Sequence, residues 1–434
     1  MSNSGNIHAV ILAAGYATRM RGLSTIIAKP ALPVAGIPIV RRQLEALRSA
    51  GIDRVTVVVK HQAESVRRAI GDPSPLGLAI DYFDMDEQGI ESWGSAYTVY
   101  RWFEQQGSLG RRQERLLILN GDIVWDKQII KPFLNAWLKR SPAWGVIVAR
   151  ETPWEKLFDR FGTMQINDPV LIQAYGRYVY ECHRAAGEAV ALTRTRQRYV
   201  EIYRKRLHEL HWRAFPISGF IERPSADDYV AHIGNLANVG IFGLKAKVFD
   251  HYARAFDCHF ADFARDLFQK GLLPDRHPLK AFIAPPEFFW RDIGTPRDLR
   301  EVNFEALAGQ GNLDLPGEEV RPGVWLGAGV NISASTLENI RPPVVIGNNV
   351  SLAAGVEIGP QVVIGNGGRV EQGAKIRNSI LFPEDREAGQ GVVVGANVVL
   401  DNCLVAGGKI EAGSELSDQV VFAADNQILI RQPI

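Results

Sequence analysis

The chain has 434 residues, of which 46% are hydrophobic and 22% are charged, and its formal net charge is +1. This composition excludes a disordered or low-complexity chain and favours a globular protein with more than one domain. No segment has the roughly 18 apolar residues that would span a bilayer, and the first ten residues lack a signal-peptide profile, so we expect a cytoplasmic protein. Three widely spaced cysteines predict neither a zinc site nor a disulfide framework.

The charge is unevenly distributed along the chain. Residues 1–310 contain 41 Lys and Arg against 34 Asp and Glu, a net of +7, whereas residues 311–434 contain 8 against 14, a net of −6. A basic first part suits small, phosphate-rich ligands. A nucleic-acid partner is the weaker interpretation, because most of the excess lies in one insert, and we expect none.

The first part of the chain alternates strand-like and helix-like segments. Strands are expected at Ala9–Leu12, Arg54–Val59 and Leu116–Leu119, and helices at Pro38–Ser49 and His61–Ile70. This alternation predicts an α/β domain with a Rossmann-like mixed, mostly parallel sheet and helices on both faces. Ligands of such sheets bind at the carboxyl ends of strands, which here include the turns after the first and third of these strands.

The turn after the first strand has the composition of a phosphate-binding loop. Small residues, Ala13-Ala14-Gly15, allow backbone N–H groups to close around phosphate oxygens, and two spaced cations follow, Arg19 and Lys29. The pattern predicts a triphosphate cradle. It is not a P-loop, because no Gly-Lys-Ser/Thr opens the helix. The alternative is a glycine-bearing turn without a ligand.

The segment Val10–Val34 resembles the signature of the sugar-1-phosphate nucleotidyltransferases, LAAGxGTRxxPLTxxxPKPxxPV. The departures are Ala17 for a Gly, Gly22 for a Pro, Ser24 for a Thr and Ala28 for a Pro. The resemblance implies nucleotide binding by the loop and catalysis by two cations and an aspartate. The implied nucleotide-binding residues are Leu12, Ala13, Ala14, Gly15, Thr18 and Gly94, and the implied catalytic residues are Arg19, Lys29 and Asp122.

Two aspartates follow apolar strands, Asp122 in LILNGDIVW and Asp292 in FFWRDIGTP. A single Gly-Asp is more often a turn than a ligand. Together, however, the two segments resemble the GD and WxDxGTP motifs that hold the metal in the same family. Mg²⁺ prefers one or two carboxylates completed by substrate oxygens and water, so we expect Asp122 and Asp292 to bind Mg²⁺.

The family binds its sugar phosphate through a lysine in an EKP motif, to which Glu222-Arg223-Pro224 is similar, with Arg223 in place of the lysine. The resemblance implies that Glu222 and Asn238 contact sugar hydroxyls and that the Gly162 amide faces the sugar. The alternative is a surface ion pair between Glu222 and Arg223. Gly94 stands where the family places a loop beside the nucleobase, and Trp93 before it either stacks on a ligand or is a core residue.

An insert of about fifty residues, roughly 166–213, interrupts the family pattern. Residues 177–213 contain nine Lys and Arg against four Asp and Glu, with an apolar helix face. This pattern predicts an extra helical element with a solvated basic face. A lid over an anionic substrate and a contact with a partner are the open alternatives.

The last part of the chain has a six-residue apolar period, beginning at Val344, Val350, Val356 and Val362 and resuming from Val392 to Leu416. This period predicts a hexapeptide-repeat parallel β-helix, and the family resemblance implies the left-handed form. Breaks at about 336–343, 367–369 and 382–391 are expected to be loops. We therefore expect a nucleotidyltransferase domain at 1–307 and a β-helix domain at 308–434.

The resemblance implies an enzyme that joins an NTP to a sugar 1-phosphate, giving an NDP-sugar and pyrophosphate by direct in-line attack. We also expect a homo-oligomer formed through the β-helix. The alternatives are a catalytically silent, nucleotide-binding regulatory subunit and, less favoured, an acyltransferase site in the β-helix. The last histidine is His277, and such acyl transfer usually needs a histidine base. The sequence indicates neither the base nor the sugar.

Overall fold

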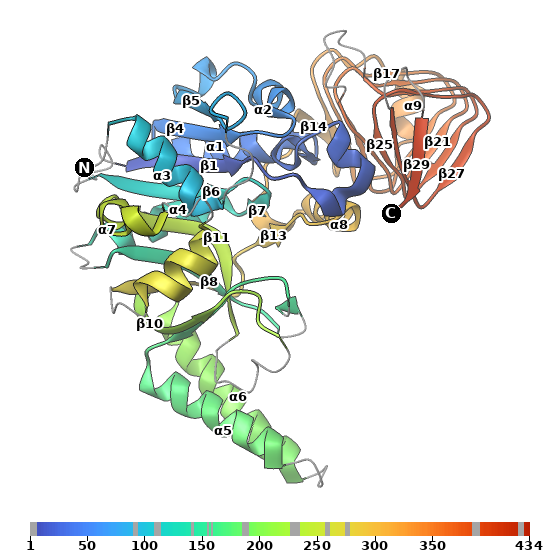
Figure 1. Ribbon diagram of the computed structural model, residues 1–434. Helices are drawn as coiled ribbons and strands as arrows, with labels where there is room; N and C mark the ends of the chain where they lie inside the picture. The colour runs from blue at the N-terminus through green and yellow to red at the C-terminus, as the bar shows by residue number, and fades with distance from the viewer. Residues whose placement is uncertain are drawn as a thin grey trace.

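The computed structural model describes residues 7–89, 94–107, 114–139, 143–153, 156–157, 159–184, 191–225, 235–256, 261–273, 278–383, 391–423 and 429–434. Figure 1 shows an α/β domain from which a pair of helices projects, with a coil of strands packed at another side of the sheet. Both predicted architectures are therefore present.

A nine-stranded mixed sheet forms the centre of the first domain, in the order β5-β4-β1-β6-β11-β8-β12-β10-β9. The first four strands in this order are parallel, and β12 is parallel to β8, whereas β11 runs antiparallel to both of its neighbours. The strands are β1 (Ile7–Ala13), β4 (Arg54–Val59), β5 (Ala79–Asp84), β6 (Arg115–Asn120), β8 (Gly145–Glu151), β9 (Thr163–Ile166), β10 (Ala214–Ile221), β11 (Leu236–Lys245) and β12 (Leu279–Ala284).

Hydrophobic cores lie on both faces of this sheet because the buried strands alternate their side chains. Along β1, Val10 packs in one core and Ile11 in the other. The helices that supply these cores and connect the strands are α1 (Ile39–Ser49), α2 (Ala63–Ile70), α3 (Ser95–Gln105), α4 (Ile130–Leu138), α7 (Lys247–Phe256) and the π-helix η8 (Phe263–Leu272). The helix α8 (Pro296–Leu307) packs instead in an apolar core shared with the β-helix. Short 3-10 segments are η2 (Thr18–Thr25), η3 (Lys29–Ala31), η4 (Ser74–Leu76), η5 (Lys127–Ile129) and η9 (Gln310–Asn312).

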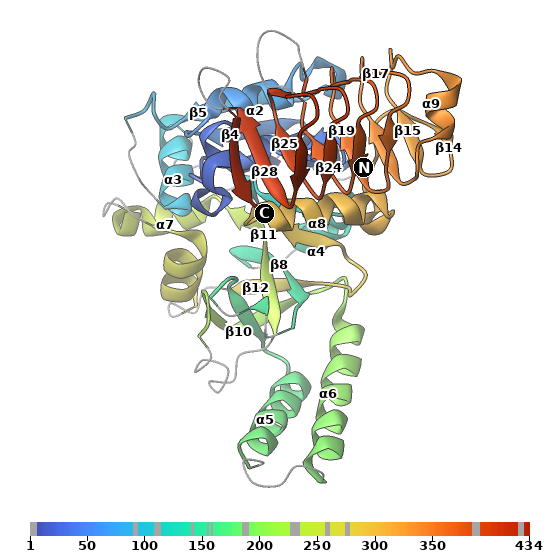
Figure 2. The same ribbon diagram turned by 90° about the vertical axis from the view of Figure 1, so that its right-hand side faces the viewer.

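The insert is a helical hairpin, as predicted. Its helices, α5 (Pro169–Arg184) and α6 (Ala191–Leu210), extend from the β9–β10 edge of the sheet and point away from the β-helix (Figures 1 and 2). Tyr203, Leu207 and Leu210 are buried, while Ile202 is 37% exposed. The apolar face of α6 therefore runs through Tyr203.

Three sheets make up the predicted β-helix. Val344 of one coil pairs with Val362 of the next, a step of 18 residues or three hexapeptides. The first sheet contains β14 (Glu318–Arg321), β15 (Val324–Leu326), β16 (Val344–Ile346), β19 (Val362–Ile364), β22 (Ile380–Leu381), β25 (Leu404–Ala406), β28 (Gln419–Ala423) and β29 (Leu429–Pro433). The others contain β17 (Ser351–Leu352), β20 (Arg369–Val370), β23 (Val393–Val394) and β26 (Lys409–Ile410), and β18 (Glu357–Ile358), β21 (Lys375–Arg377), β24 (Val399–Asp401) and β27 (Glu415–Ser417). The strands of these sheets pair in parallel except for the end pairs β14–β15 and β28–β29 of the first sheet, which are antiparallel. The left-handed sense stays a prediction.

Two of the predicted breaks differ in the structure. The segment 336–343 is partly helical, because α9 (Ala334–Glu338) lies there. The break at 367–369 is not a loop: Gly368 leads directly into β20, and a Cβ there would lie 2.8 Å from Cγ2 of Ile364. Gly368 therefore occupies an inward-facing position of the six-residue period, where there is no room for a side chain. Most of the third break, 384–390, lies outside the described residues.

A further apolar core joins the two domains. The first β-helix sheet contributes Val345, Val363, Ile380, Leu404 and Phe422, and the first domain contributes residues of η2 and α8. Figure 2 shows this sheet running across α8. At the interface, Arg300 of α8 donates to Asn402 Oδ1 at 2.8 Å. Among the described residues, none of the helices has the length and apolarity needed to cross a membrane.

Candidate active site

A cleft lies where β1 and β6 end, as the sequence predicts for a sheet of this kind. It consists of two adjoining compartments of about 480 Å³ and 220 Å³. The residues that line both are Ser95, Asn120, Asp122, Arg223 and Asp262. The compartments therefore meet around Asp122.

The loop after β1 forms a wall of the larger compartment. Leu12, Ala14 and Gly15 line it, and a Cβ on Gly15 would meet no heavy atom within 4 Å. Gly15 therefore faces open space, as expected of an amide that approaches a ligand. Ala13 is buried, and Thr18 is exposed at the start of η2.

Ala17 has φ 54°, a left-handed conformation that costs a residue with a Cβ about 1–2 kcal/mol. The backbone conformation gives a reason for glycine at this position, and here the tight turn into η2 is kept at the cost of strain.

Lys29 and Asp122 form an ion pair within the cleft. Lys29 Nζ lies 3.2 Å from Asp122 Oδ2, and their side chains are 11% and 31% exposed. Pro30 follows Lys29 in η3 and packs near Gly121, where a Cβ would lie 2.9 Å from Pro30 Cγ and 2.6 Å from the Leu12 carbonyl oxygen. There is therefore no room for a side chain at Gly121, because Pro30 and the backbone of β1 lie against it.

Asp292 is brought beside Asp122 by a two-stranded ribbon. β13 (Trp290–Asp292) pairs antiparallel with β7 (Ile123–Trp125), and Ile293 N donates to the Asp122 carbonyl oxygen at 3.1 Å. Burial and the neighbouring Asp122 carboxylate raise the pKa of Asp292 to about 6, with Lys29 and Arg160 opposing. Two predicted metal ligands, 170 positions apart in sequence, thus share one site.

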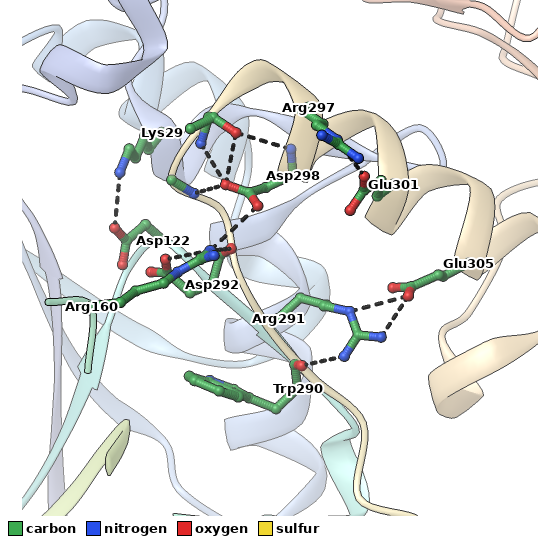
Figure 3. Close-up of polar contacts among 12 residues, drawn as sticks. Lys29, Asp122, Arg160, Trp290, Arg291, Asp292, Arg297, Asp298, Glu301 and Glu305 are labelled. Carbon is green, nitrogen blue, oxygen red and sulfur yellow. Dashed lines mark hydrogen bonds and ion pairs between the residues drawn. The ribbon is translucent and has the colours of Figure 1, made fainter. Parts of the chain in front are cut away.

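Arg160, for which the sequence suggested no role, pairs with two carboxylates of this site. Its Nη2 lies 3.3 Å from Asp292 Oδ2 and 3.3 Å from Asp298 Oδ1 (Figure 3). Asp298 completes a capping box with Thr295 at the start of α8. The Gly-Thr-Pro motif therefore fixes the helix that follows Asp292, and Arg160 ties that helix to the carboxylate.

The residues predicted to contact the sugar phosphate line the smaller compartment together: Gly162, Glu222, Arg223 and Asn238. A Cβ on Gly162 would lie 2.5 Å from Glu222 Oε2, and Asn238 N donates to the Gly162 carbonyl oxygen at 2.7 Å. Burial and the nearby Asp262 raise the pKa of Glu222 to about 7, although Arg223 opposes this. Glu222 Oε2 is buried without a hydrogen-bond partner among the described residues.

Arg223 is 70% exposed, and its Nε lies 3.7 Å from Glu222 Oε1. Its φ is 51°, so a bulky residue holds a left-handed conformation at the edge of the cleft. The ion pair that we considered as an alternative is present but loose. Arg223 lines both compartments of the cleft.

Gly94 is buried rather than exposed to the cleft. A Cβ on it would overlap the Ala261 carbonyl oxygen and lie 2.8 Å from Asp262 N, so its packing already requires glycine. Its role beside a base stays a prediction, and Trp93 lies outside the described residues. Ser95 and Thr98, at the start of α3, line the compartment instead.

Lys60 and Asp262 are further cleft residues that the sequence analysis missed. Lys60 directly follows β4, is 8% exposed and has its Nζ 5.9 Å from the centre of the Tyr16 ring. The rule that ligands bind at strand ends could have identified it. Asp262 caps η8 and accepts from Ser95 Oγ at 2.8 Å. Its pairing with α3 is a long-range contact with no local signal.

A nucleotidyl transferase family model matches residues 8–175 and 200–309, more than half of the chain. The chain belongs to this family. The match omits 176–199, which lie within the α5–α6 hairpin, and ends before the β-helix. The hairpin tip is therefore an addition to the family fold.

Curated relatives extend the similarity. Over 392 residues the chain is 27% identical to UTP–glucose-1-phosphate uridylyltransferase of Synechocystis, covering 87% of this chain and 83% of that protein. It is 26% identical to glucose-1-phosphate adenylyltransferase of Geobacillus stearothermophilus, over 71% of this chain and 67% of that protein. It is 31% identical over 118 residues to mannose-1-phosphate guanylyltransferase of Mycobacterium tuberculosis, over 27% of this chain and 30% of that protein. Their names specify different bases.

Proposed function

We propose that this family member joins an NTP to a sugar 1-phosphate, releasing an NDP-sugar and pyrophosphate. The observation that carries the proposal is the meeting of two compartments at Asp122. One has the small-residue loop and Lys29, the other has Glu222 and Asn238, and Arg223 lines both. Two anionic substrates placed in these compartments would have their reacting groups on either side of the paired aspartates.

In the proposed reaction, a phosphate oxygen of the sugar 1-phosphate attacks the α-phosphorus of the NTP. The new P–O bond forms as the bond to the β-phosphate bridging oxygen breaks, and pyrophosphate leaves in line. Lys29 lines the larger compartment, and Arg19 lines the smaller one, which Asp122 also lines. We assign both cations to charge on the triphosphate, which would reach the junction of the two compartments, and Arg223 to the attacking phosphate. None of the described cleft residues is needed as a covalent nucleophile.

Asp122 and Asp292 fit a Mg²⁺ ion, because burial and mutual repulsion of two adjacent carboxylates favour a bound cation. The ion would supply charge neutralisation to the phosphates when bound. No cluster of three or more His, Cys, Asp or Glu suited to a metal occurs among the described residues, so substrate oxygens would complete the coordination.

We predict that Asp122→Asn and Asp292→Asn each lower turnover by roughly a hundredfold or more, because each removes charge that organises the reacting phosphates. Pyrophosphate release with varied Mg²⁺, and with chelator, measures this. Glu301→Gln is the matched control, because it changes an exposed carboxylate of α8 that pairs with Arg297 of the same helix. Near-normal rates in both metal-site variants, insensitive to chelator, would exclude the metal assignment.

We predict that Arg223→Ala raises the KM for sugar 1-phosphate at least tenfold more than the KM for NTP. Arg223 replaces the signature lysine and lines the compartment of Glu222 and Asn238. Arg223→Lys should keep much of the activity if charge and reach suffice. The same assay on Arg19→Ala should show the reverse split, and an NTP-dominated defect in Arg223→Ala would reverse the assignment.

The silent-subunit alternative keeps nucleotide binding without turnover. The presence of Arg19, Lys29, Asp122 and Asp292 in one cleft favours the active enzyme. We further propose a cytoplasmic homo-oligomer assembled through the β-helix. The first β-helix sheet covers the catalytic domain, so subunit contact would use the other two sheets or the coil end.

A further inference from the structure

The last hairpin of the β-helix rests on the segment that carries Arg19. β28 and β29 pair antiparallel, and two of their residues, Phe422 and Gln432, reach η2 at Gly22. Phe422 is 1% exposed and belongs to the core between the domains. The contact point is three residues beyond Arg19, within the same short segment.

The contact at Gly22 has no free space. A Cβ on Gly22 would overlap Phe422 Cζ, and it would lie 2.8 Å from Cε1 and 2.9 Å from Gln432 Nε2. Gly22 N also donates to Gln432 Oε1 at 3.4 Å. Gly22 does not have a positive φ, so the backbone itself does not require glycine. The absence of a side chain at Gly22 allows the phenyl ring of Phe422 to pack against the backbone there.

The same segment reaches the catalytic cleft at its other end. Arg19 lines the smaller compartment, and a Cβ on Gly294, two residues after Asp292, would lie 3.2 Å from Arg19 Cζ. Met20 and Leu23, on either side of Gly22, are 1% and 0% exposed in the interdomain core. The backbone of η2, which carries Arg19, therefore packs against the β-helix.

We infer that Phe422 is a positioning residue for Arg19, so that the β-helix completes the triphosphate site of the catalytic domain in the same chain. This inference rests on the proposed function. A misplacement of about 1 Å in a group that contacts the reacting substrate can cost a hundredfold in rate, so a packing contact three residues away is close enough to matter. The β-helix then has a catalytic consequence without chemistry of its own.

The test is a double-mutant cycle on Phe422→Ala and Gly22→Ala, with pyrophosphate release measured against each substrate. Phe422→Ala should raise the KM for NTP or lower kcat roughly tenfold or more, with the KM for sugar 1-phosphate changed less than about twofold. Gly22→Ala should be similarly impaired, because its methyl group overlaps the ring. The double variant should be no worse than the worse single variant, since removing the ring makes room for the methyl group.

Phe382→Ala is the matched control. Phe382 is 2% exposed in the same interdomain core, two strands away from β28 in the sheet order, so its loss should lower the melting temperature without changing the KM for NTP. Equal KM changes in Phe422→Ala and Phe382→Ala, or multiplicative losses in the double variant, would overturn the inference.

Hydrogen exchange in a peptide covering residues 14–25 separates this inference from the proposed function. Phe422→Ala should accelerate exchange there, and Phe382→Ala should not, whether or not turnover is detected. A wild-type protein that is inactive with every substrate pair, yet shows this exchange pattern, would refute the function and keep the positioning contact. Unchanged exchange in Phe422→Ala would refute the contact's role even in an active enzyme.

Discussion

At the scale of single residues, the cleft contains backbone conformations and an ionisable group that lower the stability of the folded protein and suit the binding of a ligand. Ala17 and Arg223 have left-handed backbones, and the half-buried Glu222 has one carboxyl oxygen without a hydrogen-bond partner in the part of the chain that the structure describes. Such features persist where the surrounding structure holds them and a ligand uses them. They are also the features least visible in the sequence, because they depend on how neighbouring segments close around them.

Glu222 gives a pH-dependent prediction. Its pKa is raised from 4.5 to about 7 by burial, so the folded protein binds this proton more tightly than the unfolded chain. The resulting stability is full below about pH 4.5 and is lost as the pH rises through 7, a change of about 3 kcal/mol. The glutamine in Glu222→Gln stays neutral. This variant should therefore have a higher melting temperature than wild type at pH 8 and the same melting temperature at pH 4.5.

The exposed Glu64, with a side-chain exposure of 71%, provides the control: Glu64→Gln should show no such pH-dependent gain. Thermal or urea unfolding of the ligand-free protein across pH 4.5–8 measures both variants. A Glu222→Gln protein that is less stable than wild type at pH 8 would contradict the burial argument.

At the scale of elements, the α5–α6 hairpin is the clearest addition to the family fold. Together with the sheet edge it forms a cavity of about 820 Å³ that is separate from the cleft. The walls of this cavity include Tyr175, Tyr203, His208 and Glu151. Tyr203, Leu207 and Leu210 anchor α6 in the core, whereas the described parts of the two helices extend away from the β-helix (Figures 1 and 2) and line neither compartment of the cleft. This arrangement favours the extra structural element over a lid.

We therefore predict that replacing residues 178–198, at the tip of the hairpin, with a short glycine linker leaves kcat and both KM values within about threefold of wild type. The buried base of α6, including Leu207, stays in place. The assay is pyrophosphate release with folding checked by thermal melting. A tenfold rise in either KM in a folded deletion variant would instead indicate that the tip covers a substrate.

The elements also show what the sequence could predict. Local periodicity predicted the β-helix and the first βαβ units, and two motifs that resemble those of the family drew attention to Asp122 and Asp292, because each signal lies within a few residues. These two aspartates line one compartment, and their role as metal ligands stays a prediction. Arg160, Asp262 and the contact of Phe422 with Gly22 were missed. Each joins segments far apart in the chain, so only the assembled fold reveals it. The break expected at 367–369 was wrong because Gly368 keeps the coil period without a side chain.

At the scale of the whole molecule, the two domains share one apolar core. The first β-helix sheet packs against Leu23 of η2, four residues after Arg19, and Leu299 of α8, seven residues after Asp292. We predict that a chain ending at Ala308 is insoluble or inactive, because this face would be exposed to water. Expression and light scattering check the truncated chain, and a soluble, fully active fragment would contradict the shared-core account.

Assembly is a separate whole-molecule prediction. Open ends of parallel coils favour association, so we expect the full chain to be a homo-oligomer. Sedimentation at micromolar concentration measures the mass in solution. A strictly monomeric protein would exclude assembly through the β-helix while leaving the proposed chemistry unaffected.

The central claim is that the cleft joins two phosphorylated substrates. The most direct measurement incubates the full chain and Mg²⁺ with a panel of NTPs and sugar 1-phosphates and identifies products by mass. The account predicts, for at least one pair, equal amounts of NDP-sugar and pyrophosphate, formed only when both substrates are present and lost in Asp122→Asn. No NDP-sugar with any pair, or NTP cleavage that does not require the sugar phosphate, would contradict it.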